Sequence, residues 1–263
     1  MFTMWCAGGD EFLWTLENAT NVIDVLGVNA EGKFHTNGMF VGCTALSSVP
    51  SFDTTKVTNM DSMFEGCSSL IDAPYLDTSN VTHMWKIFKD CASLTSVPLY
   101  DTSKITNLDG FVEAFMNCSS LTSVPLFNLS NTDTLNRTFY GCTSLVSVPK
   151  FDITNVDAMQ STFANCTSLT TIPLFDTRNL NYMSNTFQNC TSLTSIPLFD
   201  TSNLYNMSYA FENCVNVQSG ALALYQQTST QARTPGHTCT FTNCGINTET
   251  GSAELAQIPS DWK

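Results

Sequence analysis

Hydrophobic residues return at fixed positions along most of the chain, in step with a cysteine that recurs every 24 residues. A phenylalanine stands three residues before each cysteine, a leucine three after it in most copies, and a proline seven after it. A period of this length is typical of a solenoid, whose repeats bury their apolar faces against each other. The periodic cysteines are Cys43, Cys67, Cys91, Cys118, Cys142, Cys166, Cys190 and Cys214.

One repeat predicts a strand, a turn and a short helical segment in that order. Residues 193–197 favour a strand with Leu193 and Ile196 inward, and the closing proline would end lateral pairing because it has no N–H donor. Residues 200–203 favour a turn, since Asp, Ser and Asn bond nearby amides. The predicted fold class is a mainly β repeat solenoid, a right-handed leucine-rich-repeat-type coil of about eight 24-residue repeats with short parallel strands and 3₁₀ or helical turns.

Both ends are expected to carry caps, because an open terminal coil would expose apolar surface. The predicted division is 1–38, an N-terminal cap or attachment segment; 39–217, the solenoid; and 218–263, the C-terminal cap. Helices are expected over 220–231 and 252–257, with Ile258 and Trp262 sealing the end. One interval has 27 residues, and its extra residues near 109–113 are predicted to bulge outward while Leu108 keeps the inward position.

The composition narrows the class of partner. Charged residues make up 13% of the 263 residues, the net charge is −13, and no basic patch occurs, so nucleic acid is not an expected partner. No run of about 18 apolar residues is present, and membrane insertion is not expected. The first residues lack the cationic and apolar segments of a secretory signal, so we expect no signal peptide.

Cysteine use favours buried thiols over disulfides or metal ligands. Eight of the eleven cysteines occupy one equivalent place between a phenylalanine and a leucine, where a free cysteine acts as a small hydrophobic side chain. Cys6, Cys239 and Cys244 lie outside this ladder. His237 with Cys239 and Cys244 suggests a zinc site but lacks a fourth ligand, so we favour a solvated histidine with two thiols in the cap. In an oxidising compartment, a disulfide from Cys239 to Cys6 or Cys244 is the alternative. No cofactor or metal is predicted.

An acidic column follows the prolines at one position per repeat. We interpret each of its side chains as a cap on its own turn. Stacked carboxylates also suit calcium, and the neighbouring pair Asp152 and Asp176 would suit a retaining glycosidase, so both alternatives stay open. Identical residues in every coil favour the structural interpretation, and no enzyme activity is predicted. The column is Asp53, Asp77, Asp101, Asn128, Asp152, Asp176 and Asp200.

Aromatic residues at positions that vary between repeats are the candidate binding residues. They interrupt a surface otherwise rich in Ser, Thr and Asn, and aromatic side chains are favoured anchors at interfaces. They are Tyr75, Trp85, Tyr100, Tyr140, Tyr182, Tyr205 and Tyr209.

The repeat Phe-x-x-Cys-x-Ser-Leu-x-x-x-Pro-x-x-Asp-Thr-Ser-x-Val-x-x-Met, best seen in 64–84 and 187–207, resembles the BspA-like, Treponema-type leucine-rich repeat surface proteins over 39–217. The resemblance implies a surface adhesin, and related copies occur in bacteriophage virion and tail proteins. The 263 residues show no signal, lipid-attachment site or sorting tail of the bacterial pattern, so we do not expect anchoring of that kind.

We therefore predict a non-enzymatic bacteriophage virion protein, a tail fibre tip or surface decoration, that contacts a protein or glycan of the bacterial host. The expected location is the virion, and the expected partners are other virion proteins and the host surface. The alternatives are a bacterial cell-surface adhesin without its targeting signal, and a purely architectural virion component. The sequence makes no prediction of oligomeric state.

Overall fold

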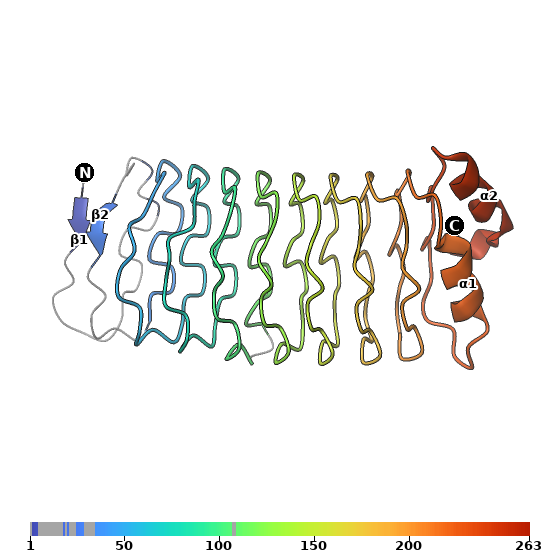
Figure 1. Cartoon of the computed structure of the whole chain (residues 1–263), viewed down its shortest axis with the longest axis horizontal. Coiled ribbons are helices and arrows are strands. Elements are labelled where there is room, and N and C mark those ends of the chain that lie inside the picture. Colours follow the sequence, from blue (N-terminus) through green and yellow to red (C-terminus); the bar gives the residue numbers. More distant parts are fainter. Residues whose placement is uncertain (1, 5–17, 19, 21–24, 29–34, 107–108) are drawn as a thin grey trace.

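The computed structural model describes residues 2–4, 18, 20, 25–28, 35–106 and 109–263. Successive coils stack side by side into a rod, and the two termini lie at opposite ends (Figure 1). The molecule is a repeat solenoid, as the 24-residue period predicts. Its regular elements are confined to the ends: β1 (Phe2–Met4), β2 (Val25–Val28), α1 (Ala221–Ser229), α2 (Glu249–Gln257) and the 3₁₀ helix η1 (Ser260–Trp262).

A main-chain ladder joins each coil to the next on one side of the rod. In the coil that contains Cys166, the amides of Met159, Ser161, Phe163 and Asn165 donate to carbonyl oxygens of the following coil at 2.8–3.0 Å. Between these amides the chain makes tight turns rather than an extended strand. Parallel pairing is therefore present as isolated bridges, and continuous strands are absent from the described coils.

Left-handed backbone explains why these segments are not strands. The residue immediately before each periodic cysteine has a positive φ, and so does the residue five before it. Positive φ is unfavourable for most side chains and is tolerated best by Gly, Asn and Asp. The position before the cysteine holds these three types: Gly42, Gly66, Asp90, Asn117, Gly141, Asn165, Asn189 and Asn213.

A second main-chain ladder runs in the opposite direction on the segment that follows the cysteine. The amides of Ser168 and Thr170 donate back to the carbonyl oxygens of Thr143 and Val146 in the preceding coil, at 3.1 and 3.0 Å. Residues 193–197, expected to form a strand, make one parallel bridge through Ser195 and Ser219. The amides just before the cysteine thus donate forward and those of Ser168 and Thr170 donate backward, while Asp157 also donates backward and Ile196 donates forward.

Aromatic rings form the centre of the rod. The phenylalanines three before each cysteine stack nearly parallel, with consecutive ring centroids 5.3–6.0 Å apart, from Phe40 to Phe241. Trp262 continues this stack beyond Phe241 with a centroid distance of 6.2 Å. Trp262 and Ile258 are buried, as expected for side chains that close the C-terminal end.

The 27-residue interval departs from the prediction in detail. Leu108 lies outside the described residues, and Phe111 occupies the inward position, buried and packed edge-on against Phe115 at 5.8 Å. The amide of Met84 bonds to the carbonyl of Gly110, which restores the normal register at that point. The insertion therefore lies between Ile105 and Gly110, earlier than most of the expected 109–113.

The C-terminal residues form two helices that pack together. Helix α1 falls within the expected 220–231, while α2 starts three residues earlier than the expected 252–257. The carboxylate of Glu254 in α2 accepts hydrogen bonds from the amides of Gly220 and Leu222, at 3.4 and 3.0 Å, and so caps the start of α1. Neither helix of this described region is long and apolar enough to span a membrane.

Part of the N-terminal segment shares the spacing of the repeats. Strands β1 and β2 pair in parallel, with Thr3 opposite Gly27 and Met4 opposite Val28, a separation of one repeat. The amide of Asn18 bonds to the carbonyl of Val41 in the first cysteine coil at 2.6 Å. The described residues of 1–38 are thus linked to one another and to the rod at the period of the coils.

Candidate binding face

The periodic cysteines lie in the core as free thiols and are buried in all eight coils. From Cys67 onward, each thiol donates to the carbonyl oxygen of the phenylalanine in the preceding coil, for example Cys142 to Phe115 at 3.1 Å. That carbonyl also accepts the amide of Cys118, its own coil's cysteine. The thiol is therefore a specific donor between coils as well as an apolar filler, and its pKa is raised by burial.

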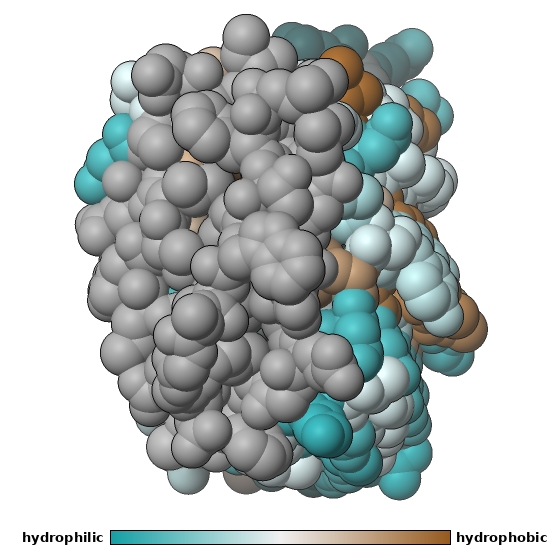
Figure 2. All heavy atoms as spheres, turned by 90° about the vertical axis from the view of Figure 1, so that its left-hand side faces the viewer, coloured by the Kyte–Doolittle hydropathy of each residue, from teal (hydrophilic) through white to brown (hydrophobic). Residues whose placement is uncertain are grey.

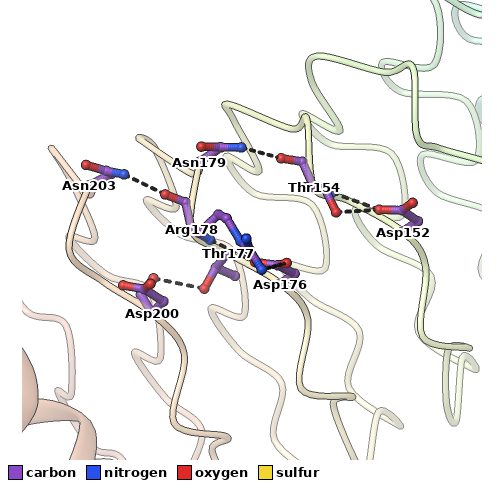
Figure 3. Close-up of polar contacts among 8 residues, drawn as sticks. All are labelled: Asp152, Thr154, Asp176, Thr177, Arg178, Asn179, Asp200 and Asn203. Atoms are coloured by element: carbon purple, nitrogen blue, oxygen red, sulfur yellow. Dashed lines mark hydrogen bonds and ion pairs between the residues drawn. The ribbon is translucent and has the colours of Figure 1, made fainter.

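The acidic column caps turns, as Figure 3 shows for Asp152 with Thr154 and for Asp176 with Arg178 on successive coils. Asp200 does the same with Ser202, whose amide and hydroxyl donate to its carboxylate at 2.9 and 2.6 Å. One carboxylate oxygen of Asp152 accepts the amide and hydroxyl of Thr154, at 3.1 and 2.6 Å. Asn179 and Asn203 reach back from the same turns to carbonyl oxygens of the preceding coil, at 2.8 and 2.6 Å. In all six aspartates of the column, hydrogen bonds from the residue two positions later, such as Thr154 for Asp152, lower the pKa of the carboxyl group.

The lowered pKa values of Asp152 and Asp176 argue against the alternative that this pair serves a retaining glycosidase. A retaining glycosidase needs one carboxyl group that keeps its proton as a general acid. The pKa values of Asp152 and Asp176 are both lowered, the first mainly by Thr154 and the second mainly by Arg178. Both groups are therefore ionised at neutral pH, which does not suit the acid role.

The described residues contain no group of three or more His, Cys, Asp or Glu side chains that could hold a metal ion. The His237 ring stacks on Trp262 with centroids 4.1 Å apart, and its Nδ1 lies 2.8 Å from the carbonyl oxygen of Pro235. Cys239 and Cys244 are free thiols, while Cys6 lies outside the described residues. His237 thus belongs to the packing of the C-terminal cap.

The candidate aromatic residues do not all reach the surface. Tyr100 was expected to be exposed, but its ring is 2% exposed, stacks on Phe88 and donates its hydroxyl to the carbonyl of Pro74 at 2.7 Å. It lies in the same column as Phe127 and Phe151, two residues after the proline, where side chains point inward. Alignment with those phenylalanines would have revealed this from the sequence.

Two of the remaining tyrosines stack on each other. Tyr182 and Tyr205 come from neighbouring coils, with ring centroids 5.8 Å apart and planes 21° apart. The guanidinium of Arg233 lies 3.5 Å from the centre of the Tyr205 ring and donates to the carbonyl of Leu204. Tyr140 is half-buried, and Tyr75 is 68% exposed in a different column.

A polar hollow of about 390 Å³ lies on the side of the rod that carries the forward ladder. Its lining comes from two adjacent positions, six and five residues before the cysteine, in four consecutive coils. The sequence analysis did not single these residues out, because their types vary from coil to coil. The lining residues are Val112, Glu113, Asn136, Arg137, Gln160, Ser161, Ser184 and Asn185.

Aromatic residues stand at both ends of this hollow. The amide of Lys86 bonds to the carbonyl of Val112, so Trp85 lies one coil before the hollow, in the same column. The amide of Asn185 bonds to the carbonyl of Ser208, which places Tyr209 one coil beyond it. We call the hollow together with Trp85, Tyr182, Tyr205 and Tyr209 the binding face.

Trp85 is held by polar contacts on either side. Its amide donates to a carboxylate oxygen of Asp61 in the preceding coil at 2.8 Å, and burial raises the pKa of that carboxyl group. The ammonium group of Lys86 lies 4.0 Å from the centre of the Trp85 ring. The indole remains 38% exposed.

The charges in the hollow are internally neutralised. Glu113 lies between Lys89, at 3.3 Å, and Arg137, also at 3.3 Å, while Lys89 further contacts Glu65 at 3.5 Å. This chain of alternating charges crosses four coils. The face is therefore polar and close to neutral within a strongly acidic molecule.

A separate row of exposed apolar side chains follows the prolines directly. The alternation is clear in each coil, since the next residue points inward; of this outward position, only Tyr75 was among the candidate residues. Lys150 interrupts the row. Figure 2 shows hydrophobic surface on one flank of the rod. The row, with exposures from 53 to 68%, is Tyr75, Leu99, Leu126, Leu174 and Leu198.

A family model described as "Mycoplasma protein of unknown function, DUF285" matches residues 34–145 and 109–223. A search of curated proteins found no match. Among solved structures, the chain is similar to a T. pallidum leucine-rich repeat protein, with 18% identity, 81% of each chain covered and a TM-score of 0.43. It is also similar to a leucine-rich cell surface protein from Faecalibacterium prausnitzii, with 18% identity, 82% and 78% covered and a TM-score of 0.37. A Bacteroides ovatus leucine-rich repeat protein shares 15% identity over 94% and 84% of the two chains, with a TM-score of 0.32.

Proposed function

The chain belongs to the family described as a Mycoplasma protein of unknown function, DUF285, and from the surface of its coils we propose that it is a non-enzymatic binding module for contact with a cell surface. The observation that carries the proposal is the binding face. Two of the seven aromatic residues singled out in the sequence, Trp85 and Tyr209, stand one coil before and one coil beyond the same polar hollow, although they span 125 residues of chain. Tyr182, two residues before Ser184 of the lining, stacks on Tyr205 of the next coil.

The construction of the rod supports a recognition role for this face. The core positions repeat almost identically from coil to coil, and they fix the scaffold. The two positions that line the hollow change instead, with Val, Asn, Gln and Ser six before the cysteine and Glu, Arg, Ser and Asn five before it. A rigid scaffold with variable surface positions is suited to binding.

The backbone gives a second reason to assign function to these positions. Lys86, Glu113, Arg137 and Tyr209 all have φ between 54° and 61°, where glycine or asparagine would be less strained. The position before the cysteine has the same constraint and holds Gly, Asn or Asp. Large side chains kept at a strained position at the surface point to a role in contact rather than in folding.

The test is binding of the purified protein to bacterial cells, measured as the cell-bound fraction by flow cytometry. We expect binding to fall at least tenfold for Trp85→Ala and for Tyr182→Ala. Tyr75→Ala is the matched control, because Tyr75 is an exposed aromatic outside the binding face. Loss of binding with Tyr75→Ala alone, or no binding by the unmodified protein, would contradict the proposal.

The carrier of the module is a separate question from its binding activity. The sequence predicts a bacteriophage particle, as a tail fibre tip or decoration, with a bacterial cell-surface adhesin as the alternative. We propose to distinguish them by immunogold labelling of cells and of purified phage particles. Label on particles, with competition between the protein and phage adsorption, supports the virion. Label on cells supports the adhesin, while malformed particles without any cell binding support the architectural alternative.

A further inference from the structure

The chemistry of the hollow suggests what class of ligand it takes. Resting on the proposed function, we propose that the hollow binds a neutral polysaccharide segment laid along the axis of the rod, with one sugar ring per coil and a ring stacked on Trp85. The ligand hydroxyl groups would bond to Asn136, Gln160, Ser184 and Asn185.

The lining groups match sugar hydroxyls in kind. Amide and hydroxyl side chains both donate and accept hydrogen bonds, as a sugar hydroxyl does. The side-chain to side-chain bonds within the lining are long, with Asn136 to Gln160 at 3.4 Å and Gln160 to Ser184 at 3.3 Å, against about 2.9 Å for a usual N–H···O bond. The main-chain amide of Gln160 holds the Asn136 side-chain oxygen at 2.7 Å, so the freely exchangeable groups are the side-chain N–H donors. Each amide group also has a second N–H. Well-placed ligand hydroxyls can therefore replace or extend these contacts at little cost.

A peptide strand fits the hollow less well. The amides of Glu113, Arg137, Ser161 and Asn185 all donate to the next coil at 2.9–3.2 Å, so the face has no open edge for strand addition. Val112 is the one aliphatic side chain of the lining, whereas protein interfaces are anchored by apolar pockets. Recognition must therefore come from polar side chains and from the exposed indole.

Charge argues against an ionic ligand. Glu113 is neutralised by Lys89 and Arg137, which leaves no unpaired cation in the lining to bind an acidic sugar or phosphate. The net charge of −13 also repels polyanions. A neutral glycan avoids both penalties.

The dimensions favour an extended chain. The lining spans four coils, whose stacked phenylalanines Phe115, Phe139, Phe163 and Phe187 are 5.4–5.6 Å apart. One pyranose ring with its linkage adds a similar length to an extended polysaccharide. The volume of about 390 Å³ is within the range of about 300–1,000 Å³ usual for ligand sites. Trp85, one coil before the hollow, is placed to stack on a further ring, since aromatic faces pack on flat apolar surfaces.

The first experiment applies the full chain to an array of neutral and acidic microbial polysaccharides. We expect retention by neutral chains of at least four sugars, unaffected by 0.5 M salt because no ion pair is involved (at this ionic strength the Debye length is about 4 Å, and exposed charges farther apart than that are largely screened). Retention by acidic glycans alone, with loss in salt, would overturn the proposal, as would the absence of any retained glycan.

Variants then assign the site. For the tetrasaccharide of the best-retained glycan, isothermal titration should show at least a tenfold weaker affinity for Gln160→Ala and for Trp85→Ala, and unchanged affinity for Tyr75→Ala. Thermal unfolding of each variant checks that the rod is intact. If the affinity survives both substitutions in folded protein, the hollow is not the glycan site.

Treatment of the cells separates this inference from the proposed function. Periodate, which cleaves vicinal diols of sugars, should abolish binding of the protein to cells, and protease treatment should not. Binding that resists periodate and is lost with protease overturns the glycan assignment while the proposed function stands. Glycan binding without any cell binding overturns the proposed function instead.

Discussion

The periodic cysteine shows what a single residue contributes to this rod. Its apolar setting was predictable, because a phenylalanine precedes it in every period and a leucine follows it in all but the last, where Val217 stands. Its hydrogen bond was not, since the acceptor is a main-chain carbonyl of the preceding coil, as between Cys166 and Phe139 at 3.1 Å. A sequence pattern places side chains inside or outside but does not locate main-chain groups of another coil.

Thiol reactivity tests this assignment. Burial raises the pKa of seven of the ladder thiols, Cys67 through Cys214, so the reactive thiolate is scarce at pH 8. We expect Ellman's reagent to modify none of the eight ladder thiols in the folded protein and all eight in denaturant, while the half-buried Cys239 reacts in both. Rapid native-state modification of any ladder cysteine, mapped by peptide mass spectrometry, would contradict this.

The strained position in the hollow gives a second test at the residue scale. Ser161 has a φ of 56°, so Ser161→Gly should relieve backbone strain and raise the free energy of unfolding by about 0.5–1 kcal/mol, after allowing for the greater freedom of glycine in the unfolded chain. Ser62→Gly is the matched control, because Ser62 has a φ of 55° and lies outside the hollow.

Urea denaturation measures both changes. Equal stabilisation by the two substitutions confirms that strain, rather than a contact of Ser161, is responsible. Destabilisation by both would show that the left-handed backbone costs serine nothing here.

At the scale of the element, the strand prediction was wrong in form, although the parallel pairing of neighbouring coils was right. Hydrophobic alternation such as Leu193 and Ile196 indicates which side chains face inward, and both are buried. It does not reveal that the backbone turns left-handed twice in the preceding segment, at Asn185 and Asn189. The Asn, Asp and Gly before each cysteine were visible in the sequence, and they were the signal of that turn.

The asparagine before Cys190 tests how these turns are stabilised. Asn189 has a φ of 61°, donates to Asn165 at 2.8 Å and accepts from Asn213 at 2.8 Å. Asn189→Ala loses both bonds and strains the turn, so the free energy of unfolding should fall by about 2 kcal/mol. Asn189→Gly loses the bonds without the strain and should cost about 1 kcal/mol.

Equilibrium unfolding in urea gives both values. Glycine is already accepted at this position in another coil, where Gly141 leaves room for the side chain of Asn117. If glycine proves as costly as alanine, the ladder of amide bonds, and not the backbone conformation, sets the requirement for asparagine.

At the scale of the whole molecule, the acidic column makes stability depend on pH. Six aspartates have their pKa lowered below the ordinary 3.8, chiefly by side-chain hydrogen bonds from the turn residue two positions on. A group with a lowered native pKa stabilises the fold above its unfolded pKa, and this contribution is lost as pH falls through the native pKa. We expect the melting temperature to fall steeply below about pH 4.

Asp152→Asn provides the control for that prediction. Asn128 makes the same turn contacts in another coil, with Ser130 as donor at 3.2 and 2.7 Å, so the amide can replace the carboxylate. The variant should match the unmodified protein at pH 7 and lose less stability between pH 4 and pH 2. Identical acid curves from calorimetry would mean that these carboxylates do not drive acid unfolding.

The period predicted the architecture of the rod, but it carried little information about the binding face. Core columns repeat, so any one copy identifies the rest. The hollow depends on Glu113, Asn136, Arg137 and Gln160, which differ from each other. The candidate residues were chosen as aromatic side chains in a polar surface, and two of them, Trp85 and Tyr209, lie at the ends of the binding face. The polar residues that line the hollow follow no sequence pattern by which they could have been predicted.

The two opposed ladders have an electrical consequence for the rod. In an α-helix every peptide dipole points the same way, and the sum leaves a partial charge at each end. Here the amides of Met159 and Ser161 point toward the C-terminal end, whereas those of Ser168 and Thr170 point toward the N-terminal end. The dipoles of one side therefore offset part of those of the other, so added coils build up less charge at the tips of the rod than the turns of an α-helix do. A molecule of this design can vary its number of repeats, and with it the reach of its binding face, at a reduced electrostatic cost from its own backbone.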